Sequence, residues 1–270
     1  MPVTRLPCPA LQPYLRQLWA MPPGNGVVLV REHVLPTGDT HLAFRLGGPA
    51  LRIFSGPHDR DGTVIGHAVV GGARSRFHVR EAGGPGGSVG ALFKPGGAEA
   101  LLGVPAGVLA GRHTPLAAIW GGTAAALLAQ LDEASEPGLQ LDRLEAFLLA
   151  RLADEADLHP AVAGALAHLQ AGASVAAAVR ATGLSHRRVL TLFRDATGLA
   201  PKEYTRVLRL QAALRAAARP GAAGWAELAL QAGFSDQAHF SREFHAFAGL
   251  TPQAWRRAAP RHPGHVAVAP

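Results

Sequence analysis

Residues 229–244 read ALQAGFSDQAHFSREF and carry the strongest structural signal in the chain. Apolar residues lead up to Gly233, and phenylalanines then recur four positions apart, which is the spacing of one helix face. Glycine enters the tight turn between two helices without strain. The stretch therefore predicts a short helix over 224–232, a turn at Gly233, and a second helix capped at its start by Ser235.

The same pattern occurs 51 residues upstream. Six positions match in type between the two copies: Val189, Phe193, Gly198, Leu199, Pro201 and Tyr204 in the first, and Phe240, Phe244, Gly249, Leu250, Pro252 and Trp255 in the second. The first copy predicts a helix over 174–182, a turn at Gly183 and a helix over 185–196 capped by Ser185. Between the copies, Pro201 opens a helix of about 27 Å that ends near Ala218.

Two helices joined by a short glycine turn form a helix-turn-helix, whose second helix enters the major groove of DNA. Helical periodicity leaves polar residues on the outer faces of the two second helices: Arg187, Arg188, Thr191 and Arg194 in the first unit, and Gln237, His239, Arg242 and His245 in the second. Arginine and glutamine make bidentate contacts with guanine and adenine edges. The sequence therefore favours double-stranded DNA as a partner.

The charge distribution supports this partner. Residues 159–270 contain 13 Lys and Arg against 5 Asp and Glu, whereas residues 1–158 contain 13 against 14. A basic domain beside a neutral one is typical of a polyanion-binding module attached to a second module.

Residues 159–257 resemble the DNA-binding domain of the AraC/XylS family of bacterial transcription regulators, which has two helix-turn-helix units joined by a long helix. The stretch 229–244, followed by Gly249-Leu250-Thr251-Pro252 and Trp255-Arg256, carries the resemblance. It implies base-facing positions at Arg187, Leu190, Thr191 and Arg194 in the first unit and at Gln237, Ala238, His239 and Arg242 in the second. It also implies a sequence-specific regulator at promoter or operator DNA, with RNA polymerase and a second copy of the chain as further partners.

The first half of the chain has a different residue pattern, one typical of strands and turns. Short Val, Ile, Leu and Phe-rich runs between Gly, Pro and Asp predict strands over 27–34, 40–46, 51–54, 63–70, 74–79 and 89–93. A helix is expected over 11–21, and helical spacing predicts helices over 98–102, 116–131, 139–153 and 161–170. The fold class expected is α+β: a β-rich sensor domain with a helical connector over 1–158, an all-α domain over 159–258, and a disordered tail over 259–270.

The stretches Phe93–Gly97, Leu101–Pro105 and Leu116–Trp120 resemble an uncharacterised sensory domain found ahead of the DNA-binding domain in some family members. That resemblance names no ligand. The architecture, a neutral β-rich module joined through helices to a basic DNA-binding module, predicts a small apolar or mixed effector bound among the strands between Val27 and Phe93. It identifies no effector-binding residue.

No catalytic, metal or cofactor site is expected. Ser88 lies in a Gly-Gly-Ser-Val-Gly stretch that matches the nucleophile-elbow pattern, but the required helix does not follow, so a hairpin turn is favoured. No His-x-His or His-x-x-x-His pair occurs among six histidines of the first half: His33, His41, His58, His67, His78 and His113. The single cysteine, Cys8, excludes an internal disulfide, and with no signal-peptide pattern the chain is expected in the cytoplasm.

Two other functions are open at this point. In the first, the protein is an enzyme whose β-rich half turns over a small molecule and whose basic half only localises it to DNA. Alternatively, the basic half binds nucleic acid without sequence preference, in which case the ratio of specific to non-specific affinity is near one.

Overall fold

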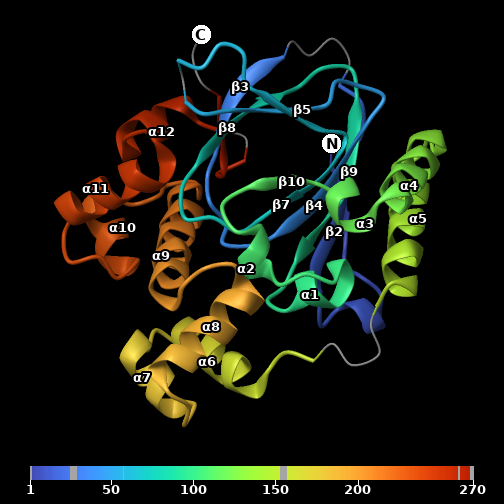
Figure 1. The fold of residues 1–270 in the computed structure, drawn as a ribbon. Coiled ribbons are helices and arrows are strands. Elements are labelled where there is room, and N and C mark those ends of the chain that lie inside the picture. The colour runs from blue at the N-terminus through green and yellow to red at the C-terminus, as the bar shows by residue number, and fades with distance from the viewer. Residues whose placement is uncertain (1, 25–28, 57, 153–156, 261, 268–270) are drawn as a thin grey trace.

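The computed structural model describes residues 2–24, 29–56, 58–152, 157–260 and 262–267. A β-rich N-terminal domain is followed by a helical C-terminal domain (Figure 1), which confirms the α+β prediction. Within the described ranges, no helix combines the length and apolar character needed to cross a membrane.

The N-terminal domain contains two antiparallel sheets. The six-stranded sheet has the order β1 (Val3–Arg5), β2 (Leu15–Met21), β9 (Gly87–Phe93), β4 (His41–Leu46), β7 (Ala68–Gly71) and β10 (His113–Pro115). The five-stranded sheet has the order β11 (His265–Ala267), β3 (Val30–Val34), β8 (His78–Ala82), β5 (Leu51–Phe54) and β6 (Thr63–Gly66). In β4, buried Leu42, Phe44 and Leu46 alternate with more exposed residues, so one face of the strand lies in the core.

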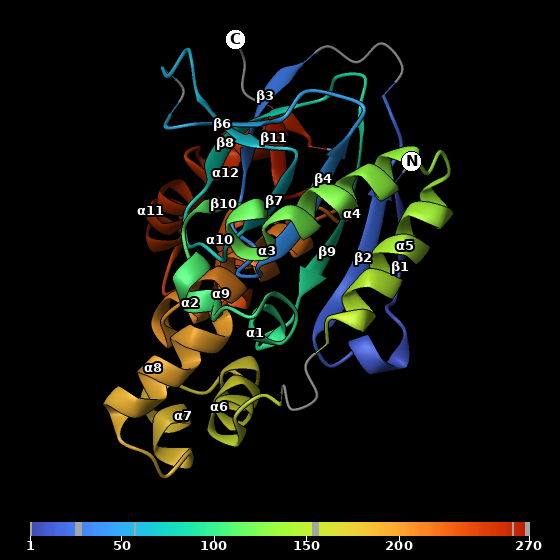
Figure 2. The ribbon, with the colours of Figure 1, turned by 45° about the vertical axis from the view of Figure 1, so that its right-hand side comes forward.

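Helices complete the N-terminal domain. They are η1 (Pro9–Leu11), α1 (Gly97–Leu102), α2 (Ala106–Leu109), α3 (Ala117–Trp120), α4 (Gly122–Glu133) and α5 (Pro137–Ala150). Buried Leu127, Leu131, Leu144 and Leu148 of α4 and α5 share one core with the six-stranded sheet. These two helices lie on the side of the sheets away from the C-terminal helices (Figures 1 and 2).

The C-terminal domain is built from α6 (Pro160–Gln170), α7 (Val175–Ala181), α8 (His186–Thr197), α9 (Pro201–Ala217), α10 (Trp225–Gln231), α11 (Gln237–Ala248) and α12 (Pro252–Ala258). Trp225 lies at the centre of its second half, with ring centroids 5.5 Å from Phe240, 5.9 Å from Phe244 and 6.0 Å from Trp255. The aromatic positions that repeat in the sequence are therefore core positions.

Four predicted elements of the N-terminal half differ in the structure. The strand predicted over 74–79 begins only at His78 and continues to Ala82 as β8. The helix predicted over 11–21 is wrong: most of it is strand β2, which buries Leu15, Leu18 and Ala20 and pairs with both β1 and β9. The run 63–70 forms two strands, because the backbone bends at Gly66, where φ is 137°. The helix predicted over 116–131 likewise divides into α3 and α4 at Gly121, where φ is 56°.

The disordered tail predicted over 259–270 is wrong for residues 265–267, which form β11 along the edge of β3. Val266 is buried there, and the Leu35 N–H donates to the Gly264 carbonyl at 2.8 Å. The expectation failed because the partner of this short strand lies more than 200 residues away in the sequence. The end of the C-terminal domain is thus attached to the N-terminal domain.

Candidate nucleic-acid interface

The first helix-turn-helix consists of α7, a turn at Gly183 with φ 69°, and α8. The Ser185 hydroxyl accepts the Arg188 N–H at 3.3 Å, which confirms Ser185 as the helix cap. Val189 and Phe193 are buried, so the opposite face of α8 is turned outward.

The second helix-turn-helix consists of α10, a turn at Gly233 with φ 80°, and α11. Its cap is Asp236 and not Ser235 as expected: the Asp236 carboxylate accepts the His239 N–H at 2.7 Å. The Ser235 hydroxyl instead bonds to that carboxylate and to the His239 ring, both at 3.0 Å. The His239 amide lowers the pKa of Asp236, followed in size by the Ser235 hydroxyl.

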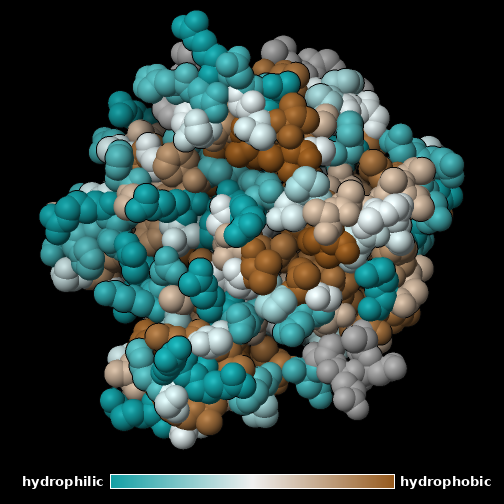
Figure 3. Space-filling view, viewed as in Figure 1, coloured by the Kyte–Doolittle hydropathy of each residue, from teal (hydrophilic) through white to brown (hydrophobic). Residues whose placement is uncertain are grey.

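The predicted base-facing side chains are open to solvent on both outer faces. The exposed ones are Arg187, Arg188, Thr191 and Arg194 on α8, and Gln237, Ala238 and Arg242 on α11. His239 is half-buried, because its ring packs edge-on against Phe234 at 5.6 Å, and Leu190 is half-buried as well. The surface over α10 and α11 is mainly hydrophilic on the side seen in Figure 3.

The arginines of these faces have unused hydrogen-bonding groups. Among the described residues, no side-chain hydrogen bond or ion pair engages the guanidinium of Arg187, Arg188, Arg194 or Arg242. Glu243, the neighbour of Arg242, is occupied by Arg206 of α9 in a two-point ion pair of 2.6 and 2.7 Å. The pair fixes α11 against α9 and leaves Arg242 without that partner.

The N-terminal domain contacts the two units at equivalent positions of the repeat. The Gly96 N–H donates to the Ala196 carbonyl at 2.9 Å, and the Phe77 N–H donates to the Phe247 carbonyl at 2.7 Å. Ala196 and Phe247 are 51 positions apart, the period of the repeat. Both are at the last turn of the second helix of their unit. The helices α8 and α11, which carry the exposed faces, are therefore both attached to the N-terminal domain at their C-terminal ends.

The glycines that follow these helices allow the close approach. Gly198 and Gly249 have φ of 80° and 71°, which closes each helix with a left-handed residue. A Cβ on Gly198 would lie 2.9 Å from the Ala73 Cβ, and one on Gly249 would lie 2.3 Å from the Phe77 ring. Leu35 and Ala73 of the N-terminal domain are also buried within the C-terminal core.

Further bonds join the domains beside α9 and α12. The His33 ring donates from Nδ1 to the Ala248 carbonyl at 2.8 Å, and Gln211 Nε2 donates to the Pro36 carbonyl at 2.7 Å. Beside β11, Glu32 accepts from Arg80 at 2.7 Å and from His265 at 2.8 Å. Burial raises the pKa of Glu32, but the His265 and Arg80 contacts outweigh it and bring the pKa to about 2.

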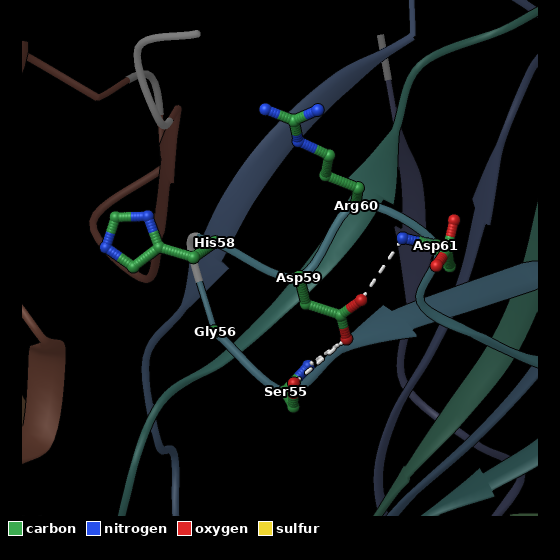
Figure 4. Close-up of a pocket in the computed structure, with 6 residues that line it drawn as sticks. All are labelled: Ser55, Gly56, His58, Asp59, Arg60 and Asp61. Atoms are coloured by element: carbon green, nitrogen blue, oxygen red, sulfur yellow. Dashed lines mark hydrogen bonds between the residues drawn. The ribbon is translucent and has the colours of Figure 1, made fainter.

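A hollow in the loop over 55–61 is lined by its own polar groups (Figure 4). The Asp59 carboxylate accepts the Ser55 N–H and hydroxyl, both at 2.9 Å, and the Asp61 N–H at 3.2 Å. With the Gly62 N–H these bonds lower the pKa of Asp59 to about 2, the Ser55 amide contributing most. The carboxylate is thus occupied in closing the loop, and His58 and Arg60 point away from it (Figure 4).

The structure also shows where the residues considered for catalysis or metal binding lie. Ser88 lies inside strand β9, so no helix follows it and the nucleophile-elbow geometry is absent at this residue. In the described ranges, no group of three or more His, Cys, Asp or Glu side chains is arranged to hold a metal ion. The structure does bring His41, His78 and His113 together, which their spacing in the sequence did not predict.

Two parts of the chain match family models. Residues 178–258 match a helix-turn-helix domain, and residues 3–115 match a domain of unknown function, DUF6597. The first match and the two exposed helix faces define the class: a DNA-binding transcription regulator. More specifically, its C-terminal domain is a helix-turn-helix domain of the AraC type, which confirms the resemblance seen in the sequence.

Solved structures of similar fold include ToxT from Vibrio cholerae, which is 10% identical over 86% of this chain and 97% of that chain, with a TM-score of 0.44. ToxT bound to (E)-4-(8-methylnaphthalen-1-yl)but-3-enoic acid is 10% identical over 87% and 98%, with a TM-score of 0.46. ToxT bound to an unsaturated fatty acid is 12% identical over 87% and 96%, with a TM-score of 0.44. A sequence comparison with curated proteins finds no match.

Proposed function

We propose that this regulator reads a two-part DNA site with α8 and α11 and that its N-terminal domain adjusts the reading through a small-molecule effector. The observation that carries the proposal is the pair of exposed recognition faces on an AraC-type helix-turn-helix domain. Base contacts are assigned to Arg187, Thr191, Arg194, Gln237, Ala238, His239 and Arg242, with Arg188 beside them at a base or phosphate.

The contacts at Ala196 and Phe247 support the regulatory part. Any movement of the N-terminal domain against either carbonyl changes the position of one recognition helix relative to the other. Two helices read successive major-groove segments only when they stand about one DNA turn apart. An effector that shifts these contacts would therefore change the affinity for DNA, and DNA would change the affinity for the effector by the same factor.

The test is selection of bound duplexes from a random pool by the full chain, followed by fluorescence anisotropy with the enriched duplex. The proposal expects an enriched motif and an affinity at least about 10³-fold above that for scrambled DNA. Affinity should fall steeply between 50 and 200 mM salt as counterions are released, on the order of 10³-fold for six or more phosphate contacts. Equal affinity for all sequences would instead support a non-specific binder.

A test for chemical turnover, rather than a binding measurement, distinguishes an enzyme from the proposed regulator. Candidate metabolites incubated with the protein should be recovered unchanged, and turnover of any of them would support an enzyme attached to a DNA-binding domain. Contact with RNA polymerase, formation of a homodimer and location in the cytoplasm stay predictions.

A further inference from the structure

Three histidines from three strands meet at one end of the N-terminal domain. His41 of β4 and His113 of β10 both pair with Gly71 of β7, from its two sides, and their ring centroids are 6.2 Å apart. His78 of β8, from the other sheet, lies 4.5 Å from His113. A Cβ at Gly71 would lie 2.2 Å from the His41 ring, so the missing side chain makes room for the cluster.

Arg74 joins this cluster and has no anionic partner there. Its Nη2 lies 3.2 Å from His113 Nδ1, and no carboxylate of the described residues forms an ion pair with it. Burial alone lowers the pKa of Arg74 to about 10, without any opposing carboxylate. A half-buried guanidinium without a counter-ion is costly, and proteins normally pair such a charge.

The cluster also holds polar atoms without partners. Among them, His78 Nδ1 is buried and makes no hydrogen bond with any described residue. The charges that lower the pKa values of His41, His78 and His113, after burial itself, belong to arginines and other histidines. The cluster therefore lies in a positive potential, which suits an anion and disfavours a metal cation.

We propose that the N-terminal domain binds the oxyanion of a small molecule, a carboxylate or a phosphate, between Arg74, His78 and His113. A guanidinium presents a planar fork of N–H donors that matches either group. The His78 imidazole can add an N–H from its unpartnered Nδ1, whereas His113 accepts from Arg74 through Nδ1 and helps to orient the guanidinium. The oxyanion supplies the negative charge and the acceptors that the cluster lacks.

The segment that carries Arg74 also touches both helix-turn-helix units. Ala73 lies against Gly198 of the first unit, and the Phe77 N–H bonds to the Phe247 carbonyl of the second. The Ser75 hydroxyl donates to Glu203 of the connecting helix α9 at 3.4 Å. An anion that repositions Arg74 thus acts on the segment that attaches both units. This regulatory consequence rests on the proposed function, whereas the binding of the anion does not.

The binding test uses the full chain without DNA. Thermal unfolding and calorimetric titration are measured with sodium phosphate, sodium butyrate or sodium chloride at equal ionic strength. Arg74→Gln removes the half-buried cation, and Arg76→Gln removes an exposed one from the same segment as the matched control. Wild type and Arg76→Gln should gain thermal stability with phosphate or butyrate beyond chloride, and Arg74→Gln should bind at least about tenfold more weakly.

If phosphate stabilises the protein more than butyrate does, the oxyanion is a phosphate; the reverse order identifies a carboxylate. In chloride, Arg74→Gln should be at least as stable as Arg76→Gln, because it removes a half-buried charge that has no carboxylate partner. The proposal is overturned if neither oxyanion exceeds chloride, if Arg74→Gln responds as the wild type does, or if Arg74→Gln fails to fold while Arg76→Gln folds. None of these outcomes depends on whether the protein binds DNA, so they leave the proposed function to its own test.

Discussion

The carbonyl oxygens of Ala196 and Phe247, at equivalent places in the two copies of the repeat, each accept a backbone N–H from the N-terminal domain. The donors, Gly96 and Phe77, belong to segments that lie far apart in the sequence. One domain therefore sets the positions of both recognition helices through backbone groups, which substitutions other than proline leave in place. A substitution that tests this arrangement must therefore add a side chain that forces the two backbones apart.

Gly249→Ala provides such a test. The new Cβ would lie 2.3 Å from the Phe77 ring and force the contact apart, in addition to the cost of about 1–2 kcal/mol for a left-handed non-glycine residue. We expect hydrogen exchange at the Phe77 amide to accelerate at least about tenfold, equivalent to about 1.4 kcal/mol. Gly233→Ala is the control, since φ is 80° there but only the Arg209 side chain is near. Equal acceleration in both variants would show a general loss of stability.

Arg242→Ala tests the reading face of the second unit. Arg242 is exposed, and Glu243 is taken by Arg206, so the guanidinium is available to a guanine edge. We expect a loss of about 1–3 kcal/mol in binding to the selected duplex and relaxed preference at one base pair. Duplexes altered one base pair at a time give the measurement. A uniform loss over every duplex would make Arg242 a phosphate or structural contact.

The sequence predicted the C-terminal domain almost completely, because its helices are bounded by local signals such as Ser185, Gly183 and Pro201 and its core positions repeat. It predicted the strands less well. Residues 15–21 alternate imperfectly, so their pattern favours a helix where the structure has strand β2, and β11 depends on a partner strand near residue 32. The contacts at Ala196 and Phe247, and the meeting of Arg74 with His113, join distant segments through backbone atoms or buried side chains, and no spacing in the sequence records them.

The histidine cluster predicts a loss of stability in weak acid. Burial, reinforced by nearby arginines, lowers the pKa of His41 from 6.5 to about 3 and that of His113 to about 2. Between pH 6.5 and about 3 the unfolded chain therefore binds more protons, so the free energy of unfolding falls as pH decreases. His41→Gln should reduce this slope by up to about 1.4 kcal/mol per pH unit, measured by urea unfolding. A wild-type slope in His41→Gln would contradict this account of the cluster.

Glu32 predicts a second acid-sensitive step at the C-terminal strand. Its pKa is lowered from 4.5 to about 2, so the stability it contributes is present above pH 4.5 and is lost as pH falls toward 2. At neutral pH, Glu32→Gln should cost about 1–3 kcal/mol of unfolding free energy and speed proteolysis of the segment after Ala258. The matched control is Glu81→Gln, whose 3.7 Å pair with Arg52 is more exposed. Equal effects of the two substitutions would mean that Glu32 has no special role in holding β11.

The most direct measurement of the central claim is duplex selection by three proteins: the wild type, Arg187→Ala with Arg194→Ala, and Gln237→Ala with Arg242→Ala. The wild type should enrich a motif of two halves centred about 10 base pairs apart, the spacing of successive major-groove segments. The first double variant should lose information in one half only and the second in the other half only. Enrichment of no motif by the wild type, or an equal weakening of both halves by either variant, would contradict the assignment of α8 and α11 as separate readers of one DNA site.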